Sequence, residues 1–296
     1  MQKLLFIHAL SPLHVGTGQS VGAIDLPIAR DKTTGFPYLP GSSLKGSLRE
    51  QAINCLKNPS DPLKNQLNPQ DDPTIKSVFG PTANNSEATL ARGSLIVGDA
   101  NLVCLPVRSI AGTFAYATSP WLLMRLNRDL LDIDKKNVLN VPPFLKVEKC
   151  IVCHDSILTI NEKVVFEDLD LSADKDSIDS LADYLAKLIF GQDKTQIDLF
   201  KKRFCIVSDD VMSFLSQHAT DIVTRVSIDQ DSGTAKDGAL WTEENLPVET
   251  ILAALLFSRT PIEPVNYLES LCQASMQLGG KATVGRGRCK LYFGNF

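Results

Sequence analysis

The sequence contains no apolar run long enough to cross a membrane. Its longest apolar stretch, residues 251–257, has the length of a strand or a piece of helix. The first residues run straight into a strand pattern without a cleavage-site signature, so we expect no secretory signal. Seven cysteines, an odd number at irregular spacing, are typical of reduced thiols in the cytosol. We therefore expect a cytoplasmic protein with no membrane partner.

The sequence also lacks an excess of positive charge. It has 30 Lys and Arg residues and 34 Asp and Glu residues, so the net charge is −4. Nucleic-acid binding requires a cationic surface, so only a local cluster could supply one. Two common phosphate-binding loops are missing as well, since no GK[ST] ending and no GxGxxG after a strand are present.

One motif that resembles a cofactor site is better explained by a strand. Residues 150–154, CIVCH, fit the CxxCH pattern of c-type haem attachment, but attachment of that kind requires export. The flanking residues indicate a strand, in which Cys behaves as a small apolar residue. No second CxxC completes a zinc site. We interpret Cys150 and Cys153 as core residues.

What is present predicts a globular α+β protein. The 296 residues are 44% hydrophobic, with a mean hydropathy of −0.01. The order of the predicted elements matches a ferredoxin-like β-α-β-β-α-β core with large insertions. A polar segment at 58–89 reads as one insertion, with a helical turn near 75–79. We predict strands at 3–10, 94–99, 111–117, 145–165, 204–207, 250–257 and through 293, helices at 43–57, 119–131, 177–190, 208–218 and 264–278, and a β-hairpin at 221–247.

Residues 14–49 form the most informative stretch. It combines His14, the glycines Gly16, Gly18 and Gly22, and the isolated carboxylate Asp25, followed by a helix that Ser42 or Ser43 can cap. Lys45 and Arg49 of this helix are four residues apart and therefore project from one face. These side chains are those of a site that holds a phosphodiester. On spacing alone, an aspartate such as Asp25 is more often a surface turn residue, and a histidine such as His14 is more often a packed loop residue.

A second glycine-rich stretch lies near the C-terminus. Residues 279–288, GGKATVGRGR, contain four glycines and three cations without an acidic side chain. Glycines let peptide N–H groups approach phosphate oxygens closely, and Lys and Arg neutralise their charge. The alternative is a glycine-capped helix followed by a turn into a strand, and chemistry alone leaves both open.

The predicted hairpin has a long, charged tip. A two-stranded ribbon is marginally stable in water unless a partner covers it. The hairpin is therefore either an ordinary edge hairpin or a protruding arm that docks on a neighbour or on nucleic acid.

Four segments together resemble the RAMP superfamily: SPLHVGTG, GAIDLPIARDKTTGFPYLPGSSLKGSLRE, RVSIDQDSGTAKDGALWTEENLP and GGKATVGRGRCKLYF. They are most similar to the repeated backbone subunit of the type III-B (Cmr) CRISPR effector. The resemblance covers both ends and the hairpin, and residues 58–195 match by outline only. The D-x-P-I-x-R block joined to the SLKG helix is the most specific part.

The resemblance implies one RAMP domain over residues 1–296. Its palm would have the ferredoxin-like (RRM-like) fold, with a fingers insertion and a protruding β-hairpin thumb. Insertions would lie at about 58–90 and 132–200, and the thumb at about 221–247. Such subunits polymerise as copies of themselves along a guide RNA (crRNA), join other subunits of the effector complex, and cleave complementary target RNA at regular intervals.

The resemblance also assigns site residues. Asp25 matches the family's aspartate that is needed to cut target RNA, and His14, Glu243 and Glu244 fall where auxiliary residues lie. Some members carry a Tyr after this acidic pair, where this chain has Asn245. The residues expected to contact RNA are Ser43, Lys45, Arg49, Arg225, Gly279, Gly280, Lys281, Arg286 and Arg288.

The chemistry of RNA agrees with these assignments. Cleavage by the neighbouring 2′-OH needs an in-line geometry that A-form stacking prevents, so a wedge that unstacks one nucleotide does much of the positioning. Asp25 would then hold a hydrated Mg²⁺ or Mn²⁺, or act as a base towards the 2′-OH. We favour the metal, because an ordinary Asp is a poor base at neutral pH. The alternatives are a non-catalytic RNA-coating protein, an endonuclease that processes guide precursors, and the type III-A counterpart.

Overall fold

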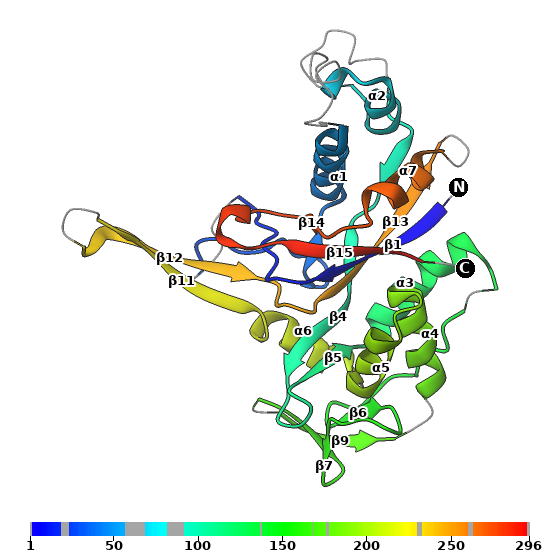
Figure 1. The fold of residues 1–296 in the computed structure, drawn as a ribbon. Helices are drawn as coiled ribbons and strands as arrows, with labels where there is room; N and C mark the ends of the chain where they lie inside the picture. The colour runs from blue at the N-terminus through cyan, green and yellow to red at the C-terminus, as the bar shows by residue number, and fades with distance from the viewer. Residues whose placement is uncertain are drawn as a thin grey trace.

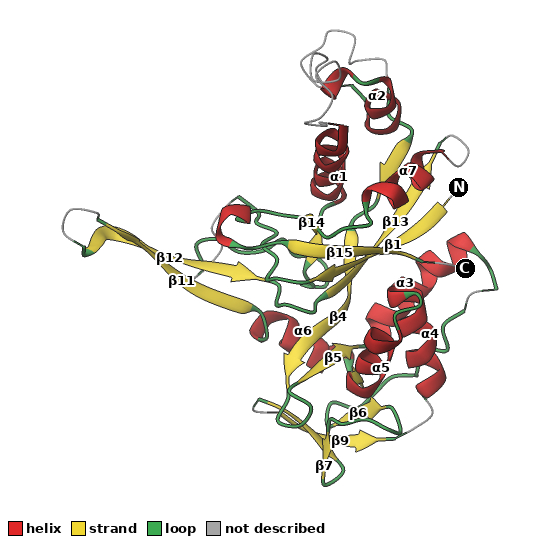
Figure 2. Ribbon diagram, viewed as in Figure 1, coloured by secondary structure: helices red, strands yellow, loops and turns green. Residues whose placement is uncertain are grey.

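The computed structural model describes residues 2–18, 24–56, 69–81, 92–136, 138–167, 169–175, 178–229, 233–259 and 263–294. The protein is a mixed α+β structure, as predicted (Figures 1 and 2). Most of the predicted polar insertion lies outside the described residues, although the helical turn predicted in it is present as α2. The helices are α1 (Gly41–Leu56), α2 (Pro73–Phe79), α3 (Pro120–Ile133), α4 (Asp179–Phe190), α5 (Lys194–Arg203), α6 (Asp209–His218) and α7 (Glu263–Leu271). The strands are β1 (Gln2–Ala9), β2 (Tyr38–Leu39), β3 (Leu95–Val97), β4 (Ala100–Arg108), β5 (Phe114–Thr118), β6 (Lys149–Val152), β7 (Thr159–Ile160), β8 (Lys163–Phe166), β9 (Leu169–Asp174), β10 (Phe204–Val207), β11 (Asp221–Ile228), β12 (Ala235–Asn245), β13 (Ile251–Ser258), β14 (Met276–Gln277) and β15 (Arg288–Phe293).

Thirteen of the described strands form one large, mostly antiparallel sheet. Its main path runs β14-β15-β1-β13-β4-β5-β10-β6-β9-β8-β7, and β2 and β3 pair beside this path with β4 and β13. The remaining two strands, β11 and β12, form a separate ribbon. Figure 1 shows this ribbon extending away from the body of the protein.

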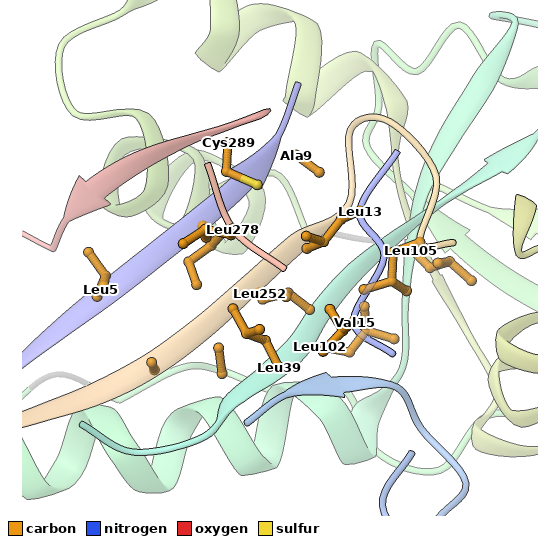
Figure 3. Packing of buried hydrophobic residues seen from close by; sticks show 14 of the residues in the cluster. Leu5, Ala9, Leu13, Val15, Leu39, Leu102, Leu105, Leu252, Leu278 and Cys289 are labelled. Carbon is orange, nitrogen blue, oxygen red and sulfur yellow. The ribbon is translucent and has the colours of Figure 1, made fainter. Parts of the chain in front are cut away.

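The central strands are buried on both faces, which explains their unbroken apolar sequences. In β1, Leu5 and Ile7 point into one hydrophobic cluster, whereas Leu4 and Phe6 point into a second. Helices α1, α2, α6 and α7 contribute to the first cluster, part of which is shown in Figure 3. Helices α4 and α5 and most of the buried side chains of α3 contribute to the second. The sheet therefore separates two layers of helices.

Local sequence signals start two helices where they were predicted. The Ser119 side chain accepts a hydrogen bond from the Leu122 N–H at the start of α3, and Ser208 does the same for the Val211 N–H at the start of α6. Pro follows Ser119 directly, at a position that needs no N–H donor.

The prediction that Ser42 or Ser43 caps α1 was wrong. The helix begins at Gly41, so both serines lie within its first turn. The Gly41 N–H donates to the Asp99 carboxylate at 2.7 Å. A partner 58 residues along the chain therefore satisfies the start of the helix, which no local cap signal reveals.

The C-terminal helix is shorter than the predicted 264–278. Helix α7 ends at Leu271, and Met276 and Gln277 then pair with β15 as the edge strand β14. Both Met276 and Leu278 are buried, a spacing of two that suits a strand. The prediction followed the apolar residues but assigned them the wrong period.

Strand β5 begins later than predicted, and several elements were not predicted. Thr113 has a φ of +75°, and this turn delays the strand predicted at 111–117 until Phe114. The elements that were missed are strand β4, which precedes the turn, the short strand β2, strand β9 and helix α5.

All seven cysteines are free thiols, and Cys55 of α1 is the exposed one. Cys150 lies in β6, as the strand interpretation of the CxxCH motif predicts, and Cys153 follows it. Burial raises the pKa of Cys153, and likewise that of Cys272 and Cys289, to about 12. Among the described residues, no helix has both the length and the apolar composition of a membrane span.

Candidate functional site

Three segments meet at the root of the β11–β12 hairpin. Leu13 and Leu246 exchange two backbone hydrogen bonds of 2.8 and 2.9 Å. Further along β12, the Leu26 N–H donates to the Thr242 carbonyl, and the Glu244 N–H donates to the Leu26 carbonyl, both at 3.0 Å. The outer edge of β12 is thus covered by two short segments, one next to His14 and the other next to Asp25.

The Asp25 carboxylate is fixed to β12 by one threonine. Its Oδ2 accepts from the Thr242 N–H at 2.7 Å and from the Thr242 hydroxyl at 3.0 Å. These bonds, the backbone one first, lower the pKa of Asp25 below its usual value of 3.8. Asp25 is exposed, and its Oδ1 has no partner within the described part of the chain. One oxygen of the ionised carboxylate is therefore held, and the other is left without a partner among the described residues.

His14 lies beside this segment and is almost fully buried, with 5% exposure. Its Nδ1 lies 2.8 Å from the Glu244 carbonyl, which can only accept, so Nδ1 carries the proton. The other ring nitrogen, Nε2, lies close to Gly16: a Cβ added at Gly16 would be 2.7 Å from Nε2. Gly279, at a φ of +68°, packs against the His14 backbone, and an added Cβ there would be 2.3 Å from the His14 carbonyl oxygen. Glycines at both places let the ring and the C-terminal loop approach.

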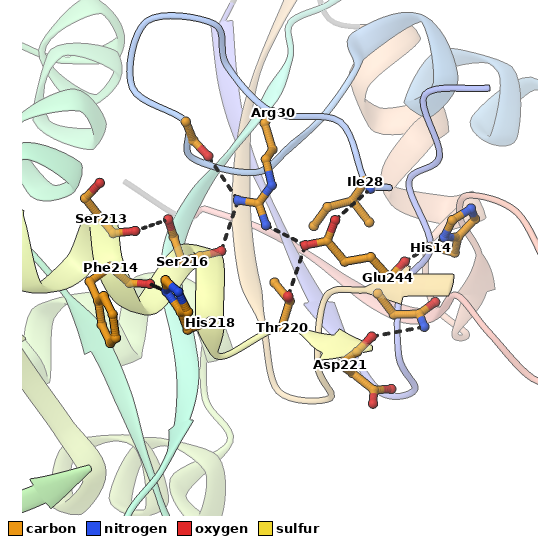
Figure 4. A network of polar contacts seen from close by, with 12 residues as sticks. His14, Ile28, Arg30, Ser213, Phe214, Ser216, His218, Thr220, Asp221 and Glu244 are labelled. Carbon is orange, nitrogen blue, oxygen red and sulfur yellow. Dashed lines mark hydrogen bonds and ion pairs between the residues drawn. The ribbon is translucent and has the colours of Figure 1, made fainter. Parts of the chain in front are cut away.

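Glu244 is surrounded by donors (Figure 4). Its Oε1 accepts from Arg30 at 2.5 Å and from the Thr220 hydroxyl at 3.0 Å, and its Oε2 accepts from the Ile28 N–H at 3.1 Å. Arg30 in turn donates to the Ser216 carbonyl of α6 at 3.0 Å. These contacts join the Asp25 segment, the hairpin and α6, so they support a role for Glu244 in holding the site together.

Glu243 lies between two arginines. It is 1% exposed, and its Oε1 is 3.6 Å from Arg225 of β11 and 3.4 Å from Arg286 of the C-terminal loop. Two arginines predicted to contact RNA therefore share one buried carboxylate, which leaves a net positive charge there.

A hollow of about 320 Å³ opens between these segments. The predicted residues His14, Ser43, Gly279 and Gly280 all line it. Its described lining contains no acidic side chain, and it combines an imidazole and a hydroxyl with glycine backbone. Such a lining suits a ribose-phosphate.

Lys45 and Arg49 lie in a different place. Lys45 donates to the Leu95 carbonyl at 2.9 Å and, with Arg92 and Arg259, lines a second hollow of about 510 Å³. Burial, followed by the charges of Arg259 and Arg49, lowers the pKa of Lys45. The cations gathered there lack an acidic partner within the described residues. The structure therefore separates the predicted RNA-contacting residues into two groups.

The rest of the C-terminal loop faces outward. Lys281 has a left-handed backbone with a φ of +63°, and both Lys281 and Arg288 are exposed. Gly287 donates its N–H to the Pro12 carbonyl at 2.8 Å, which ties the loop to the segment before His14. Gly22, the third glycine of the N-terminal stretch, lies outside the described residues.

The donor atoms at Asp25 suit a hydrated ion rather than a closed cage. Among the described residues, no cluster of three or more His, Cys, Asp and Glu side chains could hold a metal. Mg²⁺ keeps several waters and is often bound by one or two carboxylates together with substrate phosphates. The free Oδ1 of Asp25 fits that pattern.

Two residues of the site were not identified from the sequence. Thr242 holds Asp25 from 217 residues away, and no sequence pattern marks it. Arg30 belongs to the D-x-P-I-x-R block, whose specificity was a signal, although its partner Glu244 was not apparent.

Comparison with known proteins gives one consistent result. The family model of the RAMP superfamily matches residues 6–290. The CRISPR system Cmr endoribonuclease Cmr4 of Pyrococcus furiosus is 32% identical over 295 residues, which cover 97% of this chain and 94% of the relative. The CRISPR system CMR subunit Cmr4 of Saccharolobus solfataricus is 27% identical, over 98% of this chain and 95% of that protein.

The structural comparison agrees. The crystal structure of oligomeric Cmr4 from Pyrococcus furiosus superposes with a TM-score of 0.73 and 27% identity. The superposition covers 99% of this chain and 97% of that one. The likeness therefore extends over the whole described fold, the hairpin included.

Proposed function

This chain belongs to the RAMP superfamily, and we propose that it is the repeated backbone subunit of a type III-B CRISPR ribonucleoprotein that binds guide RNA and cleaves complementary target RNA. Its copies would assemble along the guide and contact other subunits at the ends. Relatives that match along almost the full length are Cmr4 proteins, which favours type III-B over the type III-A counterpart.

The strand order supports a ferredoxin-like palm. Strands β15, β1, β13 and β4 are neighbours in that order, and each neighbouring pair is antiparallel. Helix α1 lies between β1 and β4 in the chain, and α7 lies between β13 and β15. This order supports a β-α-β-β-α-β palm, in which the remaining elements would be insertions. The β11–β12 ribbon would be the thumb that pushes between nucleotides.

The observation that carries the proposal is the exposed, ionised Asp25 at the root of this ribbon. A nucleotide unstacked by the ribbon would present its 2′-OH and phosphate at the ribbon's root, which is where the free Oδ1 lies. The neighbouring hollow offers His14 Nε2, the Ser43 hydroxyl and the glycine backbone to the adjoining ribose-phosphate. The chain would thus position the RNA, while the 2′-OH of the RNA itself attacks.

The lowered pKa of Asp25 favours the metal-ligand role over the general-base role. A general base works best when its pKa lies near the operating pH, and the hydrogen bonds from Thr242 move Asp25 away from that range. A permanently ionised carboxylate instead suits a hydrated Mg²⁺ or Mn²⁺, with Asp25 as its protein ligand. When bound, such an ion would stabilise the charge that develops on the phosphate and the leaving oxygen.

The test is Asp25→Asn in the assembled, guide-loaded complex. Asn retains the size of the side chain but removes its charge, so target cleavage should be lost while assembly and target binding remain. Cleavage is measured on end-labelled target RNA, and binding is measured by filter retention. Unchanged cleavage would leave the chain as a non-catalytic RNA-coating subunit, and lost assembly would make Asp25 structural. Cutting of free guide precursor by the isolated chain would favour the processing endonuclease.

A further inference from the structure

Asp25 and Thr242 are joined by three hydrogen bonds. In addition to the two bonds donated to Oδ2, the Asp25 N–H donates to the Thr242 hydroxyl at 3.1 Å. The hydroxyl thus accepts from the Asp25 backbone and donates to the Asp25 side chain. A single side chain fixes both the main chain and the carboxylate of one residue.

The backbone of β12 explains why this contact forms. The Thr242 N–H and carbonyl both point away from β11, towards Asp25 and Leu26. The edge of the ribbon would otherwise expose these groups. Asp25 Oδ2 accepts the hydrogen bond that the carbonyl of a third strand would otherwise accept. The position of the carboxylate therefore depends on the position of β12 rather than on that of the large sheet.

We propose that Thr242 is the positioning residue for Asp25: it clamps one carboxylate oxygen to the root of the ribbon so that the other oxygen faces the RNA. This inference rests on the proposed cleavage function. It adds that the carboxylate and the ribbon move as one unit, so the element that unstacks the nucleotide also carries the acidic group to it.

The hydroxyl of Thr242 can be removed without releasing the loop. The bonds of Leu26 to the Thr242 and Glu244 backbones remain, as does the bond from the Ile28 N–H to Glu244. Thr242→Val keeps the branched shape that suits a strand and deletes only the oxygen. The variant should therefore fold, with Asp25 held by the Thr242 backbone N–H alone.

Thr224 provides a matched control. It lies directly opposite Thr242 in the ribbon, on the same face, and it is exposed. Thr224→Val makes the same chemical change on that face, one strand away from Asp25. Thr242→Ser restores the hydroxyl without the methyl group.

The experiment measures single-turnover cleavage and target binding by guide-loaded complexes that carry each variant. Thr242→Val should slow cleavage by up to about 100-fold, the loss expected when a reacting group shifts by about an ångström. Target binding should be unchanged, Thr242→Ser should recover most of the rate, and Thr224→Val should cleave like the wild type.

Three outcomes would overturn the inference: wild-type cleavage by Thr242→Val, equal losses in the Val and Ser variants, or weakened target binding in step with the lost rate. Asp25→Asn, measured in parallel, separates this inference from the proposed function. If Asp25→Asn abolishes cleavage and Thr242→Val does not, only the positioning role fails. If Asp25→Asn cleaves normally, the proposed function fails first.

Discussion

At the scale of single residues, the site contains carboxylates in three different states. Asp25 is exposed and half free, Glu243 is buried between two arginines, and Glu244 is buried and bonded through both oxygens. The resemblance assigned all three as site residues, and the sequence around Asp25 had already made that residue a candidate. Their surroundings give each a separate test.

Glu244→Gln should lower the free energy of unfolding. Gln lacks the charge that pairs with Arg30, and the hydrogen bonds of a buried carboxylate are worth about 2 kcal/mol each. We expect a lower urea midpoint for the isolated chain. The control is Glu148→Gln, because Glu148 is exposed and should tolerate the change.

A Glu244→Gln chain with the wild-type midpoint but no cleavage in the complex would contradict this expectation. That result would place Glu244 in the chemistry, as the resemblance implies.

At the scale of elements, the sequence predicted those that local signals define. Strands β1 and β13 were found because both faces are apolar, and α3 and α6 because serine caps begin them. The start of α1 and the end of α7 were wrong, because Asp99 and the β15 edge determine them through contacts distant in sequence. The Asp25–Thr242 pair escaped prediction for the same reason. Charged residues could be assigned from motifs, but their partners could not.

Helix α1 allows a test of RNA binding. Lys45→Met keeps the apolar stem and removes one charge from the hollow that it shares with Arg92 and Arg259. If Lys45 contacts a guide phosphate, affinity should fall, and the slope of log K against log salt should shrink by about 0.7. The measurement is a guide-RNA binding titration at several salt concentrations.

The control for this titration is Lys163→Ala. Lys163 is an exposed residue of β8, in a part of the protein distant from α1. Lys45→Met with an unchanged slope would remove Lys45 from the phosphate contacts.

A half-buried carboxylate joins three strands. Glu249, just before β13, accepts hydrogen bonds from Tyr116 of β5 and from His8 of β1, whose Nε2 is 2.8 Å away. Burial alone would raise the pKa of Glu249, but the bonds from His8 and Tyr116 outweigh it and hold the pKa below the usual 4.5. The ionised form therefore stabilises the fold.

Glu249→Gln should lower the free energy of unfolding by about 1–2 kcal/mol at pH 7, because the hydrogen bonds to a charged acceptor are weakened. A lowered folded pKa contributes stability that is complete above the unfolded value and is lost as the pH falls through the folded one. The gap between wild type and variant should therefore narrow below a pH of about 4.5. Urea unfolding at a series of pH values measures it, and a gap independent of pH would disprove the charged role.

At the scale of the whole molecule, charge is distributed rather than abundant. The net charge of −4 gives no sign of RNA binding, yet the described cations gather in the α1 hollow and around the C-terminal loop. Within the described part of the chain, the body is one sheet with helices on both faces, and the ribbon forms a separate sheet. The β11–β12 ribbon could therefore contact the next copy of the chain without any change in the hydrophobic core.

The cysteines have a practical consequence. Six thiols are buried and Cys55 alone is exposed, so a maleimide dye should attach once per native chain without any mutation. Because every copy would carry its dye at the end of α1, energy transfer between differently labelled copies would report their spacing along a guide. Mass spectrometry should find one adduct on the native chain and seven after denaturation. Cys55 is thus a natural labelling site from which the distance between copies can be measured.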